Sequence, residues 1–237
     1  MTKKRTIMYN TKTLRGTIFC APIKYSKEFI TSLAGVIDGY LPMLVRDNGV
    51  LPGLPTWQLT SPDEKEVLAF NGDKIDLVQV VESEIGEEQI TEFASRCKKV
   101  FGRILETTGY VCTRIALAPS VIVAEKAAKP TALYNRIFAV RELDGVYLDT
   151  SNISQVYRLN KTIGGNDIKI NHVSNFHVEN ELVTIGGINQ LRERYIGDFD
   201  INTMVNPEYK FSVVDVKEFM DMAPSCFARF YNLYFAD

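Results

Sequence analysis

Short runs in which apolar and polar residues alternate predict β-strands in the first half of the chain. The clearest signal is a hairpin, in which two such runs, 67–70 and 75–81, flank the dipeptide Asn71-Gly72. Asn-Gly readily adopts the positive φ values of a tight two-residue turn, so we place the turn at these two residues. Further strands, rich in β-branched and aromatic residues, are predicted at 16–21, 56–60 and 110–117.

Apolar residues recur at helical spacing in two other stretches of this half. Ser26 is a favourable N-cap for a helix whose apolar face begins at Phe29 and which Pro42 is expected to end. A longer helix is predicted between Gly86 and Gly109. Its apolar face comprises Ile90, Phe93, Ala94, Cys97, Phe101, Ile104 and Leu105.

The second half of the chain is predicted to consist mostly of strands. The low-complexity stretch 124–130 fits a connector between the halves, and a short helix is predicted at 132–139. Glycine pairs at 164–165 and 186–187 mark turns. The predicted strands are 155–159, 168–170, 176–178, 190–196 and 209–213.

An aromatic helix is predicted at the end of the sequence. Asp215, with Glu218 three residues later, has the arrangement of a capping box, and Pro224 is expected to kink or split the helix. So many aromatic side chains favour packing on a sheet or on another chain. The apolar face comprises Phe219, Ala223, Cys226, Phe227, Phe230 and Tyr234.

Together these elements predict a two-layer α+β fold of mostly antiparallel sheet with helices packed on one face. The connector divides the chain into two halves of similar size, residues 1–124 and 125–237. The second half is the richer in strands and is closed by the aromatic helix. Whether the halves are a duplication stays open, because no residue-level repeat supports it.

Composition fits a folded, soluble protein. The chain has 237 residues, of which 46% are hydrophobic and 24% charged, and these fractions exclude disorder, collagen and disulfide-dense mini-proteins. No stretch approaches the roughly 20 apolar residues of a membrane span. The basic start lacks the apolar core of a secretory signal. We therefore expect a cytoplasmic protein.

The small net charge of -2 hides a strong segregation. Residues 1–27 carry seven basic and no acidic side chains, whereas residues 62–92 carry ten acidic side chains and two basic ones. The two segments either neutralise each other or form solvated surfaces. Alternatively, the basic segment meets an acidic partner, nucleic acid included. A pI near 5.8 argues against a dedicated nucleic-acid-binding protein, which needs an extended basic face.

Cysteine and histidine offer little material for chemistry. The cysteines form no C-x-x-C pair and lie among apolar neighbours, as small buried residues do. His172 and His177 are expected on opposite faces of a strand, which favours ordinary sheet positions over a shared metal. The glycine pairs lack the companions of a phosphate-binding loop, so ATP, GTP and NAD are not expected as cofactors. The cysteines are Cys20, Cys97, Cys112 and Cys226.

Carboxylates give one alternative with a catalytic mechanism. Asp198 and Asp200 lie on the same side of an extended strand, a spacing that can hold Mg²⁺. The set Asp149, Asp167 and Lys169 loosely matches metal-dependent nucleases, in which acids hold the metal and a lysine stabilises developing charge. Asp167, however, is also explained as a turn residue after Gly164-Gly165. A Mg²⁺-dependent nuclease or phosphohydrolase is therefore an alternative hypothesis.

Candidate binding residues lie on the long helix and on the strand at 56–60. Arg96, Lys99 and Arg103 follow one another at helical spacing, a stripe that either grips phosphates or is simply solvated. Trp57, with tyrosines, could line a small-ligand pocket between the halves.

Several short segments carry a resemblance to an uncharacterised, sporadically distributed bacterial protein family of about this length. They are Ala21-Pro22-Ile23, residues 56–61 before the Asn-Gly hairpin, the long helix leading into residues 114–117, Asp198-Phe199-Asp200 and the terminal aromatic helix. The resemblance implies no established reaction and no catalytic residues. A patchy distribution is consistent with a phage, mobile-element or defence context. The basic first segment and residues 140–165 depart from the family.

The leading hypothesis is a non-enzymatic binding or assembly protein of bacterial or phage origin. The scarcity of histidine, of paired cysteines and of phosphate loops favours it over an enzyme. A protein partner or self-association is expected, nucleic acid is a less favoured partner, and no cofactor or membrane contact is expected.

Overall fold

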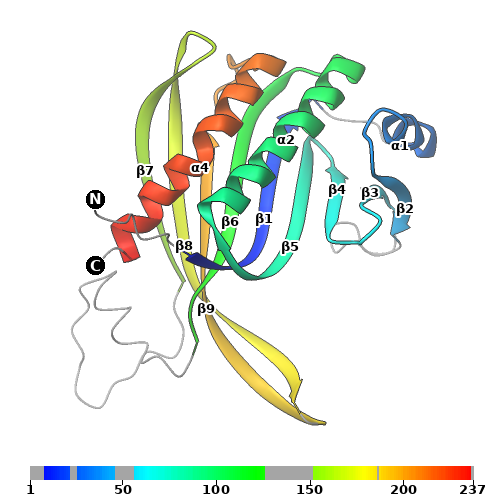
Figure 1. The fold of residues 1–237 in the computed structure, drawn as a ribbon. Helices are drawn as coiled ribbons and strands as arrows, with labels where there is room; N and C mark the ends of the chain where they lie inside the picture. The colour runs from blue at the N-terminus through cyan, green and yellow to red at the C-terminus, as the bar shows by residue number, and fades with distance from the viewer. Residues whose placement is uncertain (1–7, 22–25, 46–55, 126–151, 186, 236–237) are drawn as a thin grey trace, which may run out of the picture.

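The computed structural model describes residues 8–21, 26–45, 56–125, 152–185 and 187–235 (Figure 1). The helix predicted at 132–139 and Asp149 lie outside these residues, as does most of the predicted connector. The elements are β1 (Met8–Cys20), α1 (Lys27–Ala34), β2 (Leu41–Val45), β3 (Thr56–Thr60), β4 (Glu66–Asn71), β5 (Lys74–Gly86), α2 (Glu87–Thr108), β6 (Cys112–Glu125), β7 (Asn152–Ile163), β8 (Asn166–Ile185), β9 (Ile188–Thr203) and α4 (Val213–Phe235).

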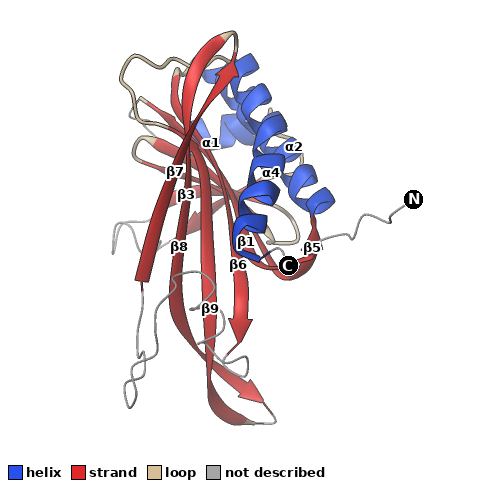
Figure 2. Cartoon of the chain, turned by 90° about the vertical axis from the view of Figure 1, so that its left-hand side faces the viewer, coloured by secondary structure: helices blue, strands red, loops and turns tan. Residues whose placement is uncertain are grey.

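All nine described strands belong to one antiparallel sheet, in the order β2-β3-β4-β5-β1-β6-β9-β8-β7. The first strand, β1, lies at its centre between β5 and β6. Helices α2 and α4 lie on the same face (Figure 2). This arrangement confirms the predicted α+β class with antiparallel strands and helices on one face. The sheet continues across the predicted boundary at 124/125 through the pairing of β6 with β9, and a division into two folding units stays a prediction.

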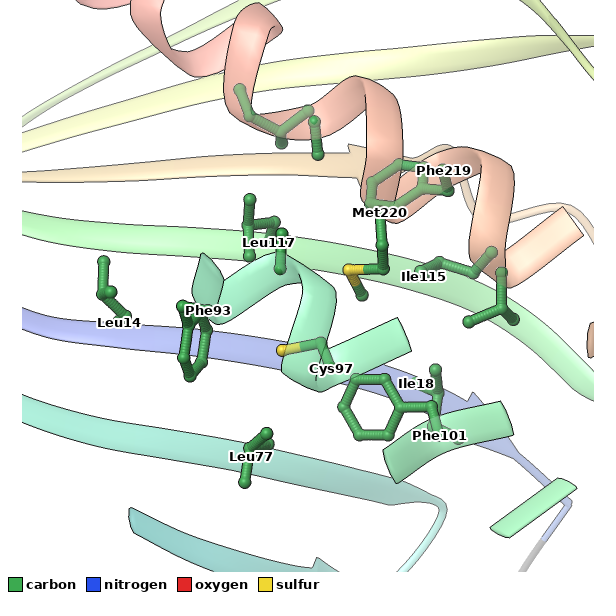
Figure 3. Packing of buried hydrophobic residues seen from close by; sticks show 14 of the residues in the cluster. Leu14, Ile18, Leu77, Phe93, Cys97, Phe101, Ile115, Leu117, Phe219 and Met220 are labelled. Atoms are coloured by element: carbon green, nitrogen blue, oxygen red, sulfur yellow. The ribbon is translucent and has the colours of Figure 1, made fainter. Parts of the chain in front are cut away.

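A glycine beneath α2 lets the helix approach the centre of the sheet closely. Gly16 of β1 is buried, and a Cβ there would overlap the sulfur of Cys97 and lie 3.3 Å from the Phe101 ring. Leu14 and Ile18 flank Gly16 on the same strand face and are almost completely buried. Figure 3 shows this layer of side chains between β1 and α2. The core therefore depends on close contact at one small residue.

Helix α2 has the predicted bounds and the predicted buried face. Gln89 Oε1 accepts a hydrogen bond from the backbone N–H of Gly86 at 2.9 Å, which satisfies one free donor at the helix start. At the other end Gly109 has a φ of 65° and donates its N–H to Leu105. Glycine adopts this left-handed conformation without strain, so the helix ends here.

Helix α4 begins earlier than predicted because Ser212, rather than Asp215, caps it. Asp215 Oδ2 accepts the N–H of Ser212 at 2.6 Å, and Ser212 Oγ accepts the N–H of Asp215 at 3.3 Å. This reciprocal pair is a capping box, shifted by three residues from its predicted place. The predicted strand at 209–213 is wrong, because only Phe211 pairs there, with Cys112.

The aromatic face of α4 is buried on the sheet as predicted. The helix stays continuous through Pro224 instead of splitting. Phe219 and Phe227, on either side of the proline, are fully buried, and this packing holds both segments of the helix against the same core. Phe227 lies 5.5 Å from the ring of Phe199 on β9.

Helix α1 is shorter than predicted and is followed by an edge strand. Ser26 caps it as expected, but the helix ends at Ala34. Gly39, with a φ of 84°, lies just before β2, in which Leu41 pairs with β3. Pro42 therefore lies inside an edge strand, where the missing N–H is tolerated.

The predicted hairpins are present with two differences. Asn71 pairs with Lys74, so the loop between β4 and β5 is Gly72-Asp73, one residue later than predicted. Only the first of these two residues has a positive φ, as in a type II′ turn. In the second half, the strands predicted at 168–170 and 176–178 are parts of one 20-residue strand, β8.

Candidate functional site

A hollow of about 810 Å³ lies beside α2, between the α1–β2 connection, the β3–β4 region and the start of α4. Its charged lining comes mainly from the exposed side of α2. Five cationic side chains face three acidic ones, so the lining carries an excess of positive charge. The cations are Arg96, Lys98, Lys99, Arg103 and Lys217, and the acids are Asp38, Glu66 and Glu106.

Arg96, at one end of the hollow, is closely paired with residues of the sheet. Its Nε lies 2.7 Å from Glu66 Oε1, and its Nη2 donates to Gln79 Oε1 at 2.8 Å. The hydroxyl of Tyr40 donates to the other oxygen of Glu66 at 2.6 Å. Burial, together with this acceptor, raises the pKa of Tyr40. Arg96 is thus engaged in joining α2 to β4 and β5.

Within the described structure, the other cations of the lining make longer ion pairs or none, with the exception of Lys98. Arg103 Nη1 and Lys217 Nζ lie 3.8 Å and 3.7 Å from the two oxygens of Glu106. Charge-assisted hydrogen bonds are shorter, at about 2.7–2.9 Å. Lys99 is exposed and has no ion-pair partner among the residues that the structure describes. Lys98, by contrast, pairs with Asp221 of α4 at 2.5 Å.

Of the four predicted binding residues, the hollow brings three together. Arg96, Lys99 and Arg103 line it, whereas Trp57 does not. Trp57 is half-buried on β3, and the ammonium of Lys27 lies 5.7 Å from the centre of its ring. Trp57 therefore packs beneath the start of α1.

The basic and acidic segments of the first half are not joined by any ion pair of the described residues. Lys12 instead pairs with Glu179 of β8 at 2.5 Å. From the acidic segment, Glu66 pairs with Arg96 and Asp76 with Lys74. Direct neutralisation of one segment by the other is not seen, because β1 meets β5 mainly through uncharged residues.

Asp198 and Asp200 lie on the sheet face opposite the helices. Asp198 accepts a hydrogen bond from Ser120 Oγ at 2.6 Å and lies 3.5 Å from His177 Nδ1. Burial raises the pKa of Asp200, although Arg114, at 4.0 Å, opposes this shift. Both carboxylates thus have partners within the sheet.

The structure does not bring Asp167 and Lys169 to this pair. Asp200 pairs with Val173 of β8, whereas Asp167 lies at the start of β8, opposite Thr162, from whose hydroxyl it accepts a hydrogen bond. Asp167 and Lys169 precede Val173 by six and four strand residues, which span about 20 Å and about 13 Å. Among the described residues, no group of three or more histidine, cysteine or acidic side chains is arranged to hold a metal ion.

The sequence did not predict the lining residues that come from elements other than α2. Lys217 is distant from α2 in the sequence, and only the packing of α4 beside α2 brings it near Gly102 and Glu106. A helix running from Ser26 to Pro42 would include Tyr40, but the early end of α1 frees Tyr40 to reach Glu66. Neither contact leaves a periodic signal in the sequence.

Comparison with known proteins adds no family assignment. No protein-family model matches the chain, and a search of curated proteins found no match. None of the described helices is long and apolar enough to cross a membrane.

Proposed function

We propose that this chain is a binding protein and that the hollow beside α2 receives an anionic group of its ligand. The observation that carries this proposal is the excess of cations over acids in the lining. The volume of about 810 Å³ falls within the range of small-molecule sites, roughly 300–1,000 Å³. The ligand class that fits is a compact phosphorylated or carboxylated molecule.

Lys99, Arg103 and Lys217 are available because their existing pairing is weak. Exposed ion pairs contribute only about 0–1 kcal/mol, and those of Glu106 are longer than good hydrogen bonds. A phosphate has several acceptor oxygens and more charge than one carboxylate. One phosphate group can therefore bind Lys99, Arg103 and Lys217 at once, and little ion-pair energy is lost when it does so.

The alternative of a Mg²⁺-dependent nuclease or phosphohydrolase has less support. It retains Asp198 and Asp200, but the register of β8 separates them from Asp167 and Lys169. Cleavage of nucleic acid that requires Mg²⁺ and is lost in Asp198→Ala would favour this alternative. The cytoplasmic setting and the bacterial or phage origin remain part of the proposal, the origin through the family resemblance.

Titration calorimetry with sodium tripolyphosphate tests the proposed site. The double variant Lys99→Glu/Arg103→Glu should weaken binding at least about ten-fold, because each lost charged contact contributes about 1.5–3 kcal/mol. Binding to the unaltered chain should also weaken as salt rises.

The matched control is Arg158→Glu/Lys169→Glu, which makes the same charge change on the exposed surface of β7 and β8. It should bind tripolyphosphate nearly as well as the unaltered chain. An equal loss in both double variants would show non-specific attraction and would contradict the proposed site. So would the absence of binding by the unaltered chain at millimolar concentration.

A further inference from the structure

The sheet has two outer strands, and they are built differently. β2 has only five residues and contains Pro42, a combination that protects an edge against further pairing. β7 has 12 residues without proline or glycine, and all of them pair with β8 in an unbroken register. Within the described part of the chain, no strand pairs with the outer side of β7. A long, regular edge of this kind is usually covered in nature.

The edge strand packs beneath α4. The ring of Tyr157 packs edge-on against Phe230 at 5.3 Å, and Gln155 Oε1 accepts a hydrogen bond from the Tyr234 hydroxyl at 2.7 Å. These contacts fix the helix-side face of β7. Its outer N–H and C=O groups are therefore presented in an ordered row, which lowers the entropy cost of pairing.

Apolar side chains border this edge on both faces of the sheet. Val156, on the face opposite the helices, is 51% exposed, and Tyr157, on the helix side, is 48% exposed. Leu233 follows Phe230 by three residues and so lies on the same side of α4, where it is 68% exposed. A partner strand at this edge would bury apolar surface in both layers.

We propose that β7 pairs with the β7 strand of a second copy of this chain, antiparallel across a two-fold axis at Tyr157. In such a contact each copy contributes the same surface. The side chains of β7 must therefore fit those of the same strand running in the opposite direction. With the axis at Tyr157, residues 152–162 all pair. Tyr157 meets the partner's Tyr157, and Val156 meets the partner's Arg158. Aromatic side chains directly opposite each other stabilise antiparallel pairs.

The neighbouring registers are less favourable. An axis at Arg158 would place two guanidinium groups directly opposite each other, which is destabilising. An axis at Val156 would pair only residues 152–160. With the axis at Tyr157, Lys161 lies opposite the partner's Ile153, and the two Lys161 side chains are eight strand residues apart, about 26 Å. The two Arg158 side chains are then diagonal neighbours two residues apart, which is less unfavourable than a directly opposite pair. Direct charge repulsion therefore disfavours the axis at Arg158, and the longer overlap favours Tyr157 over Val156.

Engineered disulfide formation tests both the interface and its register. Tyr157→Cys should form an inter-chain disulfide under mild oxidation, because directly opposite residues have the Cα separation that a disulfide requires. The four natural cysteines are buried, so the unaltered chain gives a low background. The cross-linked fraction of Tyr157→Cys should exceed that of Leu44→Cys, on the opposite edge strand, about ten-fold. Light scattering should show a dimer for the unaltered chain.

A monomer at about 100 μM, where even weak standard-sized interfaces associate, would overturn the proposal. So would equal cross-linking of Tyr157→Cys and Leu44→Cys. Preferential cross-linking of Arg158→Cys would overturn the register. Because these measurements do not involve the hollow beside α2, they stand or fall independently of anion binding.

Discussion

A single missing side chain at Gly16 sets the distance between the sheet and α2. Gly16→Ala would place a methyl group on the sulfur of Cys97, and overpacking of this kind costs about 1–3 kcal/mol. We expect a clear fall of the urea midpoint. Removing the sulfur as well, in Gly16→Ala/Cys97→Ala, should restore part of the loss.

Gly102 is the matched control, because it is also buried but lies inside α2. A Cβ there would come no closer than 3.4 Å, to the flexible end of Lys217. Alanine is favoured over glycine in a helix by about 0.5–1 kcal/mol, so Gly102→Ala should be neutral or stabilising. Equal urea midpoints for Gly16→Ala and the unaltered chain would refute the close-packing explanation.

A buried histidine should make the fold sensitive to acid. His172 is 5% exposed, its Nε2 has no hydrogen-bond partner in the described structure, and burial lowers its pKa to about 4. Lys161 and Arg229 add to this shift. Because the folded-state pKa lies below the ordinary value of 6.5, protonation favours the unfolded chain. Stability is therefore lost as the pH falls through 6.5 towards 4.

His172→Leu should reduce this pH dependence. Between pH 7 and pH 5 the variant should lose about 1–2 kcal/mol less unfolding free energy than the unaltered chain. Comparing slopes is necessary because Asp200, whose pKa is raised, contributes in the opposite direction. His177→Gln, on the other face of the sheet, should keep the original slope. If the unfolding free energy of His172→Leu depended on pH as steeply as that of the unaltered chain, the acid sensitivity would come from other groups.

The candidate site was predictable from the sequence only where its residues share one element. Arg96, Lys99 and Arg103 follow from helical spacing within α2, which the structure reproduces almost to the residue. Lys217 and Tyr40 depend on how α4 and α1 are placed. Such contacts arise from packing, on which local spacing carries no information.

At the scale of elements, the β8–β9 hairpin stands out because its end leaves the body of the sheet. Among the described residues, the arm, which we define as residues 180–185 and 187–193, pairs only between its own two strands, since β7 joins β8 at His177 and β6 joins β9 at Arg194. Figure 1 shows it projecting from the sheet. Its exposed apolar residues are Leu182, Ile188 and Leu191, each about two-thirds exposed.

Shortening the arm should leave the fold intact. A two-stranded ribbon without a third strand is marginally stable, and none of the described side chains of this one belongs to the core beneath α2 and α4. Replacing residues 182–191 by Asn-Gly should therefore change the urea midpoint very little. Amide hydrogen exchange in the arm should be much faster than in β1. A variant that loses cooperative unfolding would show that the arm supports the sheet.

Boundaries of elements were predicted well where a local stop signal exists and poorly where tertiary pairing decides. Gly86 and Gly109 bound α2 as expected. The periodic stripe after Ser26 suggested a helix as far as residue 41, but pairing with β3 makes Leu41–Val45 a strand. A short apolar run is compatible with a helix or a strand, so the presence of β3 as a pairing partner determines that this segment is a strand.

At the scale of the whole molecule, the sequence predicts the layers but not the order of the strands. Alternation and helical stripes were enough for an antiparallel sheet covered by helices on one face. They could not show that both halves of the chain share one sheet. That property depends on the pairing of β6 with β9, between residues such as Leu117 and Ile201 that are far apart in the sequence.

The central position of β1 has a consequence for how the chain folds. Ile18 pairs with Ile75 on one side and with Ile115 on the other, so β1 must wait for two partners that follow it in the sequence. Bringing β1 together with β5 and with β6 requires the chain between them to close into loops. Loop closure costs entropy before the strand contacts form, so non-local pairing of this kind slows folding. During synthesis β1 leaves the ribosome with both edges unpaired. Among the described strands, β1 thus stays longest without any partner, and during that time its edges are exposed to aggregation.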